Sequence, residues 1–452
     1  MYLSGITFDN SPLDYFWQIV DPLLLKTDLW RSISHLHSQP PLFNGFVGVV
    51  LGVFPGHENL VFSLTYKLCG LVLCLSMASL MIRLGIPPLL AAAVTAFYIV
   101  SPSVIIYENF LLYEYPAAAI LCLAAWASQK FAETDGILSG LMFFFGCSVI
   151  VFLRSGFTLM WFGAVLVIAV CILRSASRKV IYACSLPLLT VLLLYTHNYY
   201  QFGFVGTSSW LGMNLTWMTV RSIPKAERER LATKAEISEL SLMEPFQGIT
   251  TYKRFLEPSS KTNVPVLDQE FKSNGEPNLH HIGYVKLSAQ YLHDAIEVAT
   301  KYPLSYLQRV GIALACFFTP SSRYGEFVDF NRKRISTWES LNDRLWCCVD
   351  VPVFSGKRRP PLCIVAVVLY ALALLLGPVL IRIQGKAAHK DGERPLALVF
   401  MWFNVAYVTL LFNCIDFGEN MRFRVLVEPF VWILTVWILV QLTRMVGRSA
   451  VK

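Results

Sequence analysis

Two stretches of this sequence place ionisable side chains at the mouth of a long apolar run, at 107–116 (YENFLLYEYP) and at 418–429 (GENMRFRVLVEP). Their charged residues are Glu108, Glu114, Glu419, Arg422, Arg424 and Glu428. Charges in or beside hydrocarbon are costly, so they are usually paired and usually functional. A planar guanidinium can bind two phosphate oxygens at once, so we expect Arg422 and Arg424 to bind a phosphate at membrane depth. We expect at least one glutamate of the first stretch to bind a sugar or to pair with Arg422.

The same residues also have ordinary explanations. An arginine beside an apolar run is often a snorkelling anchor, and a glutamate there is often half of a structural ion pair. The polar residues that flank Arg422 and Arg424, including Glu419 and Glu428, are denser than anchoring requires. This density favours a binding site.

Candidate acid–base residues lie near the N-terminus. Asp14 and Asp21 are seven residues apart and therefore near one face of a predicted helix, where a carboxylate could take a proton from an acceptor hydroxyl. A solvated helix face is the alternative. His37 and Gln39 belong to the turn-rich stretch HLHSQPPLFNG (35–45), which we expect to join the same cavity and to position a sugar or an acceptor.

The composition identifies the class of protein. Of 452 residues, 55% are hydrophobic and only 15% are charged, and the mean hydropathy is +0.53. A soluble domain carries about a quarter charged residues, so this chain is predicted to be a polytopic membrane protein. The net charge of +8 is then a signal of topology and of lipid headgroups, and no nucleic-acid partner is expected. The cysteines are expected to behave mostly as small hydrophobes, without a metal site.

Nine apolar segments are expected to cross the membrane, at 60–82, 87–106, 115–128 with its flanks, 137–153, 157–173, 180–195, 361–381, 396–412 and 425–442. The predicted fold class is an all-α polytopic membrane protein with about nine to eleven helices. Its expected parts are an extracytoplasmic first loop at 1–59 with an amphipathic helix at 13–30, an N-terminal transmembrane bundle at 60–197, an extracytoplasmic or interfacial loop domain at 198–360, and C-terminal transmembrane helices at 361–452.

Basic residues in the short connections predict the orientation. The clusters around Arg178, Arg382 and Arg444 are expected in the cytosol, which places both charged mouths and the loop domain on the other side. This orientation requires 303–360 to cross the membrane an even number of times. The simplest solution is that 304–318 lies in the interface without crossing, although the basic run 332–334 would favour the cytosol. A sequon at Asn214-Leu215-Thr216 is compatible with a luminal loop domain.

Hydrolase, P-loop, zincin and dinucleotide-binding motifs are absent from the sequence. A transferase that used a nucleotide sugar would be expected to carry a nucleotide-binding domain, so a lipid-linked sugar is the favoured donor. Two short motifs agree with this. HSQPPLFN (37–44) and YEYP (113–116) resemble the Pro-Pro-Leu and Glu-Pro motifs of GT-C class membrane glycosyltransferases, notably the protein O-mannosyltransferase and aminoarabinose transferase families (glycosyltransferase family 39-like).

The resemblance implies a GT-C-like bundle with a soluble extracytoplasmic insertion. It implies an inverting transfer of a sugar from a polyprenyl- or dolichyl-phosphate carrier, on the luminal or periplasmic face, to an acceptor that the sequence does not name. The family's catalytic Asp corresponds to Asp14. No cofactor is firmly predicted, and a divalent cation stays open. The expected location is the endoplasmic reticulum membrane in a eukaryote, or the inner membrane in a bacterium.

Two alternatives remain at this point. A transporter or flippase would show repeated halves and charges at the middle of the membrane, and the sequence shows neither. A catalytically inactive relative is compatible with two departures from the family. Tyr15 stands where a second acidic residue is expected, and no transmembrane helix is predicted before Asp14.

Overall fold

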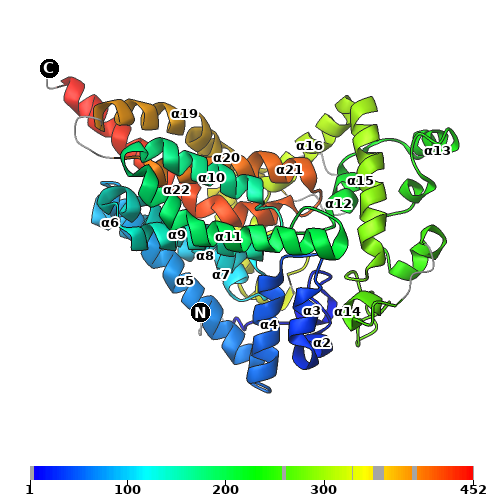
Figure 1. The fold of residues 1–452 in the computed structure, drawn as a ribbon. Helices are drawn as coiled ribbons and strands as arrows, with labels where there is room; N and C mark the ends of the chain where they lie inside the picture. Colours follow the sequence, from blue (N-terminus) through cyan, green and yellow to red (C-terminus); the bar gives the residue numbers. More distant parts are fainter. Residues whose placement is uncertain (1–4, 257–260, 328, 350–360, 389–393, 451–452) are drawn as a thin grey trace.

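The computed structural model describes residues 5–256, 261–327, 329–349, 361–388 and 394–450, and most of them form helices. The two strands among them, β1 (Cys348–Val349) and β2 (Leu362–Cys363), form one short antiparallel ladder. In Figure 1 the helices form a V, with the long helices in one arm and α12, α13, α15 and α16 in the other.

The long-helix arm is built from segments that are apolar along most of their length. It contains α5 (Glu58–Arg83), α6 (Pro88–Ile99), α7 (Pro102–Glu108), α8 (Glu114–Thr134), α9 (Ile137–Leu153), α10 (Leu159–Ile172), α11 (Ser177–Phe202), α19 (Ile364–Ala388), α20 (Leu396–Tyr407), α21 (Asn413–Ile415) and α22 (Asn420–Ala450). A turn of π-helix at Val408–Phe412 joins α20 to α21.

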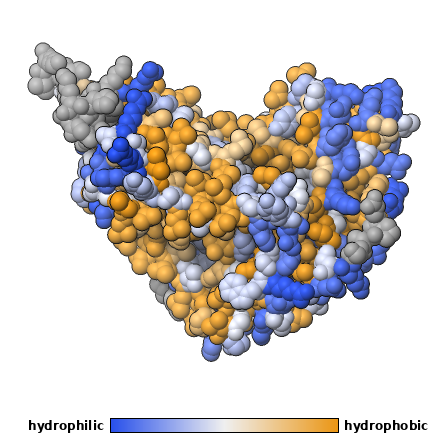
Figure 2. All heavy atoms as spheres, in the orientation of Figure 1, coloured by the Kyte–Doolittle hydropathy of each residue, from blue (hydrophilic) through white to orange (hydrophobic). Residues whose placement is uncertain are grey.

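Among the described residues, five helical segments are long and apolar enough to cross a membrane, or six if the bent pair α6–α7 forms one broken span. The pair is bent by 65°, and Pro102 begins its second half. Figure 2 shows hydrophobic side chains over most of the long-helix arm and hydrophilic ones over the outer side of the other arm. These features indicate an all-α membrane protein.

Basic residues gather at one end of the long helices. Arg83 at the end of α5 pairs with Glu133 near the end of α8 (2.5 Å), and Arg444 of α22 donates to the carbonyl of Gly85 (2.7 Å). Arg394, before α20, pairs with a carboxylate just after α8 at 2.7 Å. The opposite ends of these helices carry Glu114, Arg154, Asp416, Arg422 and Arg424. The two charged mouths therefore share one end of the arm, away from the basic end.

The N-terminal region differs from the expected amphipathic helix at 13–30. It forms α1 (Pro12–Tyr15), α2 (Pro22–Thr27) and α3 (Leu29–Ser34), followed by α4 (Pro41–Val53). Proline disfavours a helical conformation in the residue before it, so Pro22 starts a new helix. The side chain of Asp21 accepts a hydrogen bond from the backbone N–H of Leu23 and caps that helix.

The second arm contains α12 (Leu211–Met218), α13 (Lys225–Thr233), α14 (Pro265–Asp268), α15 (Gly283–Lys301) and α16 (Pro303–Phe317). This arm has a small core of its own. Trp210, Tyr252, Tyr284 and Tyr291 are buried together there. Helix α12 lies so close to α15 that a Cβ on Gly212 would be 1.9 Å from the carbonyl oxygen of Ser288, so this position requires glycine.

Two short helices, α17 (Asp329–Arg334) and α18 (Ser336–Leu345), return the chain to the long-helix arm. A disulfide between Cys348 and Cys363 follows them, so the expectation that Cys363 behaves as a small hydrophobe was wrong. The last span also differs from expectation, since α22 begins at Asn420 rather than at 425. Arg422 and Arg424 therefore lie within the helix, not outside it.

Candidate functional site

A cavity of about 250 Å³ lies where the two arms meet. It is lined by Trp17, Gln18, Gln39, Arg154, Ser155, Trp210, Asn214, Trp217, Phe246, Asp416, Phe417, Glu419 and Arg422. The first loop, the turn after α9, helix α12 and the α21–α22 connection thus each contribute. Pockets for drug-sized ligands span roughly 300–1,000 Å³, so this one is small. Its lining of aromatic rings, amides, carboxylates and guanidiniums suits a polar ring that carries an anionic group.

Glu114 is the centre of the ion-pair network beneath the cavity. Its Oε1 lies 3.1 Å from Nη1 of Arg154 and 3.6 Å from Nε of Arg422. Nη2 of Arg422 also pairs with Glu419 at 3.0 Å. The side chain of Glu114 is 0% exposed, so water screens these interactions little. One buried carboxylate therefore holds two guanidiniums at the floor of the cavity.

Aromatic rings fix the orientation of these guanidiniums. Arg154 lies over the rings of Tyr113 (4.8 Å) and Phe423 (4.9 Å), and it also donates to the hydroxyl of Tyr113. That hydroxyl donates to Gln18, which lines the cavity. Nη1 of Arg422 lies 3.3 Å from the hydroxyl of Tyr324. A cation–π contact is stronger when the guanidinium is partly removed from water.

Arg309 of α16 is a third cation close to the cavity, although it is not among the residues that line it. Its Nε donates to the carbonyl of Trp217 (3.2 Å), and its guanidinium carbon lies 3.7 Å from the ring centre of Phe417. Both of those residues line the cavity. Within the described part of the chain, no acidic side chain forms an ion pair with Arg309, which is half-buried. A half-buried cation without a counter-ion is a candidate anion ligand.

Asp416 is the acidic residue in the cavity that is least committed to a partner. Its Oδ1 accepts from the backbone N–H of Phe417 (2.7 Å), and no ion pair involves it within the described residues. Desolvation raises the pKa of this carboxyl, and the nearby Arg422 opposes that rise. A carboxylate with a raised pKa is a stronger base, so Asp416 is suited to accept a proton from a substrate hydroxyl.

His37 joins the first loop to the second arm. Its Nε2 donates to the carbonyl of His280 (2.9 Å), so Nδ1 of the neutral ring accepts from the hydroxyl of Ser209 (2.7 Å). Ser38 contacts Nδ1 of His280 at 2.5 Å. Burial lowers the pKa of His37 to about 4 and that of His280 to about 3. Both rings are therefore neutral at physiological pH, and their contacts join residues 37–38 of the first loop to the second arm.

The structure brings together some of the residues that the sequence singled out. Gln39, Glu419 and Arg422 line the cavity, and Glu114 lies directly beneath it. His37 is buried behind the wall and does not line the cavity.

Three other residues lie elsewhere. Asp14 is exposed on α1 and is not among the lining residues. Glu108 faces α5, where a Cβ on Gly70 would lie 2.6 Å from its Oε1. Arg424 is two residues from Arg422 and so points to the opposite side of the helix, where its Nε lies 3.9 Å from Glu428. The expected clamp of two arginines on one phosphate is therefore not formed by this pair.

Other cavity residues were not predicted. Arg154 and Asp416 carry cavity charges that were not predicted, and Trp17 and Trp217 supply rings. Arg309, which contacts the lining residue Phe417, was not predicted either. The sequence did contain a signal for Arg154, because this residue directly follows an apolar run and begins the short polar stretch Arg-Ser-Gly.

The last two points about the cavity region concern the sequon and metal ions. The sequon lies in helix α12 with Asn214 lining the cavity, so a glycan on this residue would fill the space. Among the residues that the structure describes, no group of three or more His, Cys, Asp or Glu could hold a metal ion.

Comparisons with protein families, with curated proteins and with solved structures found no match to this chain.

Proposed function

We propose that this protein is an inverting membrane glycosyltransferase that takes its sugar from a polyprenyl- or dolichyl-phosphate carrier. One observation carries the proposal. Arg309, a half-buried cation with no acidic partner among the described residues, contacts Trp217 and Phe417, and both of these residues line a cavity with several aromatic and amide side chains. A guanidinium there can bind the carrier phosphate, while the rings and amides bind the sugar.

The surroundings of Arg309 favour a lipid-borne phosphate over a soluble one. On the same helix, Leu304 is 73% exposed and Leu307 is 60% exposed. Exposed leucines beside a phosphate ligand suit a substrate whose tail lies in hydrocarbon. Helix α16 has 15 residues and is not among the candidate spans, which fits a position in the interface. The finer fold proposal is a GT-C-like bundle in which nine helical segments, with α6–α7 as one, run between the basic end and the cavity end.

The proposed reaction uses the cavity groups as follows. The Asp416 carboxylate takes the proton of the acceptor hydroxyl, whose oxygen attacks the anomeric carbon from the face opposite the phosphate. The bond between that carbon and the phosphate oxygen breaks, and the carrier leaves as its phosphate with the bonding electron pair. Arg309, Arg154 and Arg422 stabilise the negative charge that develops on this leaving group. Attack from the opposite face inverts the anomeric configuration.

The sequence and the cavity suggest different residues as the general base. The family resemblance implies Asp14, whereas the cavity geometry favours Asp416. Comparing Asp14→Asn with Asp416→Asn in a sugar-transfer assay distinguishes them. We expect Asp416→Asn to lose at least about 100-fold in turnover while Asp14→Asn stays active, because general-base groups contribute roughly 10²–10⁴-fold.

Carrier binding can be tested without knowing the acceptor. Binding of a short-chain polyprenyl phosphate to the purified protein is measured for wild type, Arg309→Gln and the control Arg444→Gln, whose arginine lies at the basic end. We expect Arg309→Gln to weaken binding about tenfold or more, as for a lost charge-assisted hydrogen bond. Equal affinity in wild type and Arg309→Gln would remove the proposed phosphate site.

A further inference from the structure

A second groove lies outside the cavity, between the broken span and helix α18. Its volume is about 430 Å³, and it is lined by Ile6, Ile105, Arg334, Ile335, Thr337, Trp338 and Leu341. Nε1 of Trp338 donates to the carbonyl of Val100 (2.7 Å), at the break between α6 and α7. Helix α18 therefore packs against a segment that is apolar enough to form part of a span. The groove between them opens beside that segment.

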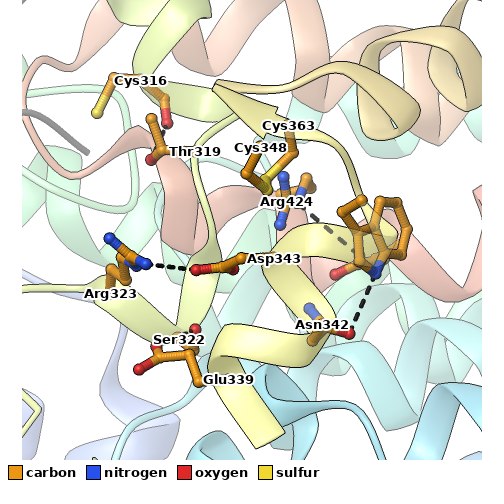
Figure 3. Close-up of a disulfide and its surroundings, with 12 residues drawn as sticks. Cys316, Thr319, Ser322, Arg323, Glu339, Asn342, Asp343, Cys348, Cys363 and Arg424 are labelled. Atoms are coloured by element: carbon orange, nitrogen blue, oxygen red, sulfur yellow. Dashed lines mark hydrogen bonds and ion pairs between the residues drawn. A yellow bond between two sulfur atoms is a disulfide. The ribbon is translucent and has the colours of Figure 1, made fainter. Parts of the chain in front are cut away.

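The charges of α18 are distributed in an unusual way, because its acidic residues point inward. Glu339 accepts from the hydroxyl of Ser322 (2.6 Å), and Asp343 pairs with Arg323. Figure 3 shows both carboxylates turned toward the chain segment that carries Ser322 and Arg323. Neither carboxylate is therefore available on the outer surface of this helix.

The outer surface of α17 and α18 is apolar and cationic. Leu341 is 48% exposed and Leu345 is 53% exposed. Lys333, Arg334 and Arg344 are also exposed, and no ion pair involves them within the described residues. The guanidinium of Arg334 lies over the ring of Phe330 at 5.0 Å, which keeps it beside the groove. Apolar side chains mixed with unpaired cations are the pattern of a helix that lies on an anionic lipid surface.

The side of the membrane on which these cations are expected to lie is a second reason to look for an anionic partner. The disulfide joins Cys348, which follows α18, to Cys363, which directly precedes α19. Disulfides persist on the oxidising side of a membrane. Cations on that side run against the usual cytosolic bias, so they need a local reason.

We propose that the groove between α7 and α18 binds one anionic phospholipid. An acyl chain lies against Ile105, Ile335 and Leu341, and the lipid phosphate lies on Arg334 and Lys333. The volume of the groove accommodates part of a chain. Arg334 lines the groove and the adjacent Lys333 is exposed, so these two cations select the charged headgroup. This site is separate from the cavity and does not depend on sugar transfer.

The test uses the full-length protein in a mild detergent, after its native lipids have been removed. Native mass spectrometry measures the binding of phosphatidylglycerol and of phosphatidylcholine with the same acyl chains. Lys333→Gln/Arg334→Gln removes the headgroup cations. Arg178→Gln/Lys179→Gln is the matched control, since it removes an adjacent exposed basic pair at the other end of the long helices. Thr337→Phe fills the groove and leaves its charges unchanged.

We expect wild type to bind phosphatidylglycerol more tightly than phosphatidylcholine by about thirtyfold, the contribution of two cations near an anionic headgroup. Lys333→Gln/Arg334→Gln should abolish this preference, the control should keep it, and Thr337→Phe should weaken phosphatidylglycerol binding. Equal binding of the two lipids by wild type would overturn the proposal. So would full selectivity in Lys333→Gln/Arg334→Gln, an equal loss in the control, or unchanged binding in Thr337→Phe.

Discussion

Replacing Glu114 by glutamine tests the ion-pair network beneath the cavity. The carboxylate is 0% exposed and lies within 3.1 Å of Arg154 and 3.6 Å of Arg422. Glutamine keeps the shape and one acceptor oxygen, but it leaves two guanidiniums close together without the central negative charge. Removing one partner of a buried ion pair costs about 3–5 kcal/mol. We therefore expect Glu114→Gln to lower the free energy of unfolding by an amount in that range.

Helix α8 also supplies the control. Glu133 pairs with Arg83 at 2.5 Å near the opposite end of the helix, but the two side chains are 34% and 35% exposed. Exposed ion pairs contribute about 0.2–1 kcal/mol, so Glu133→Gln should change stability by less than about 1 kcal/mol. Reversible unfolding in a sodium dodecyl sulfate titration, followed by tryptophan fluorescence, measures both variants against wild type.

A double variant separates charge coupling from general damage. If the loss in Glu114→Gln comes from unbalanced guanidiniums, then Glu114→Gln/Arg154→Gln should be less destabilised than the sum of the two single variants. A Glu114→Gln protein no less stable than Glu133→Gln would refute the reasoning, because it would mean that the buried carboxylate balances nothing. Strict additivity in the double variant would contradict the proposed coupling between Glu114 and Arg154.

Three further predictions follow from individual groups. The pKa of His37 falls from 6.5 to about 4 in the folded protein, so the unfolded chain binds more protons between these values, and stability should decrease as pH falls from 6.5 toward 4. Thermal unfolding at a series of pH values should show a decline of at most ~1.4 kcal/mol per pH unit from this group, and His37→Asn should show a smaller one. Because the pKa of Asp416 is raised, transfer activity should fall on acidification at a higher pH than an ordinary aspartate would give, and a pH–rate profile without this limb would exclude Asp416 as the base. Cys348 and Cys363 should resist alkylation until a reductant is added, and peptide mapping that finds both thiols free in protein from native membranes would contradict the oxidising location.

Hydropathy predicted several helices well because a span needs only a continuous apolar run. The segment expected at 137–153 coincides with α9 (Ile137–Leu153), and α20 begins at Leu396 as expected. Composition alone also pointed to an all-α membrane protein. The expected number of nine to eleven spans remains a prediction, since five or six segments of the described chain meet the length and hydropathy requirement.

Other features could not be predicted because they depend on contacts between distant segments. The helix expected at 13–30 is broken where Pro22 follows the capping Asp21, a local signal that the apolar spacing outweighed. The pairing of Cys348 with Cys363 joins two residues that are 15 positions apart, and no spacing rule specified it.

The charged residues of the cavity illustrate the same limit. Arg422 and Glu114 were identified because each stands beside a long apolar run. Arg309 and Asp416 have no such local signal. Asp416 becomes a candidate only because it lines the cavity, and Arg309 only because it contacts two of the lining residues. Asp14, chosen through a family resemblance, is exposed outside it.

The central claim is that the cavity binds the phosphate of a lipid-linked sugar at the non-cytosolic end of the long helices. The most direct measurement is an experimental structure of the protein in a lipid nanodisc with a polyprenyl-phosphate sugar. We predict density for the phosphate beside the guanidinium of Arg309, with the sugar between Trp17 and Trp217 and the lipid tail leaving along α16. A phosphate bound at the basic end near Arg444, or a cavity that stays empty under saturating ligand, would contradict it.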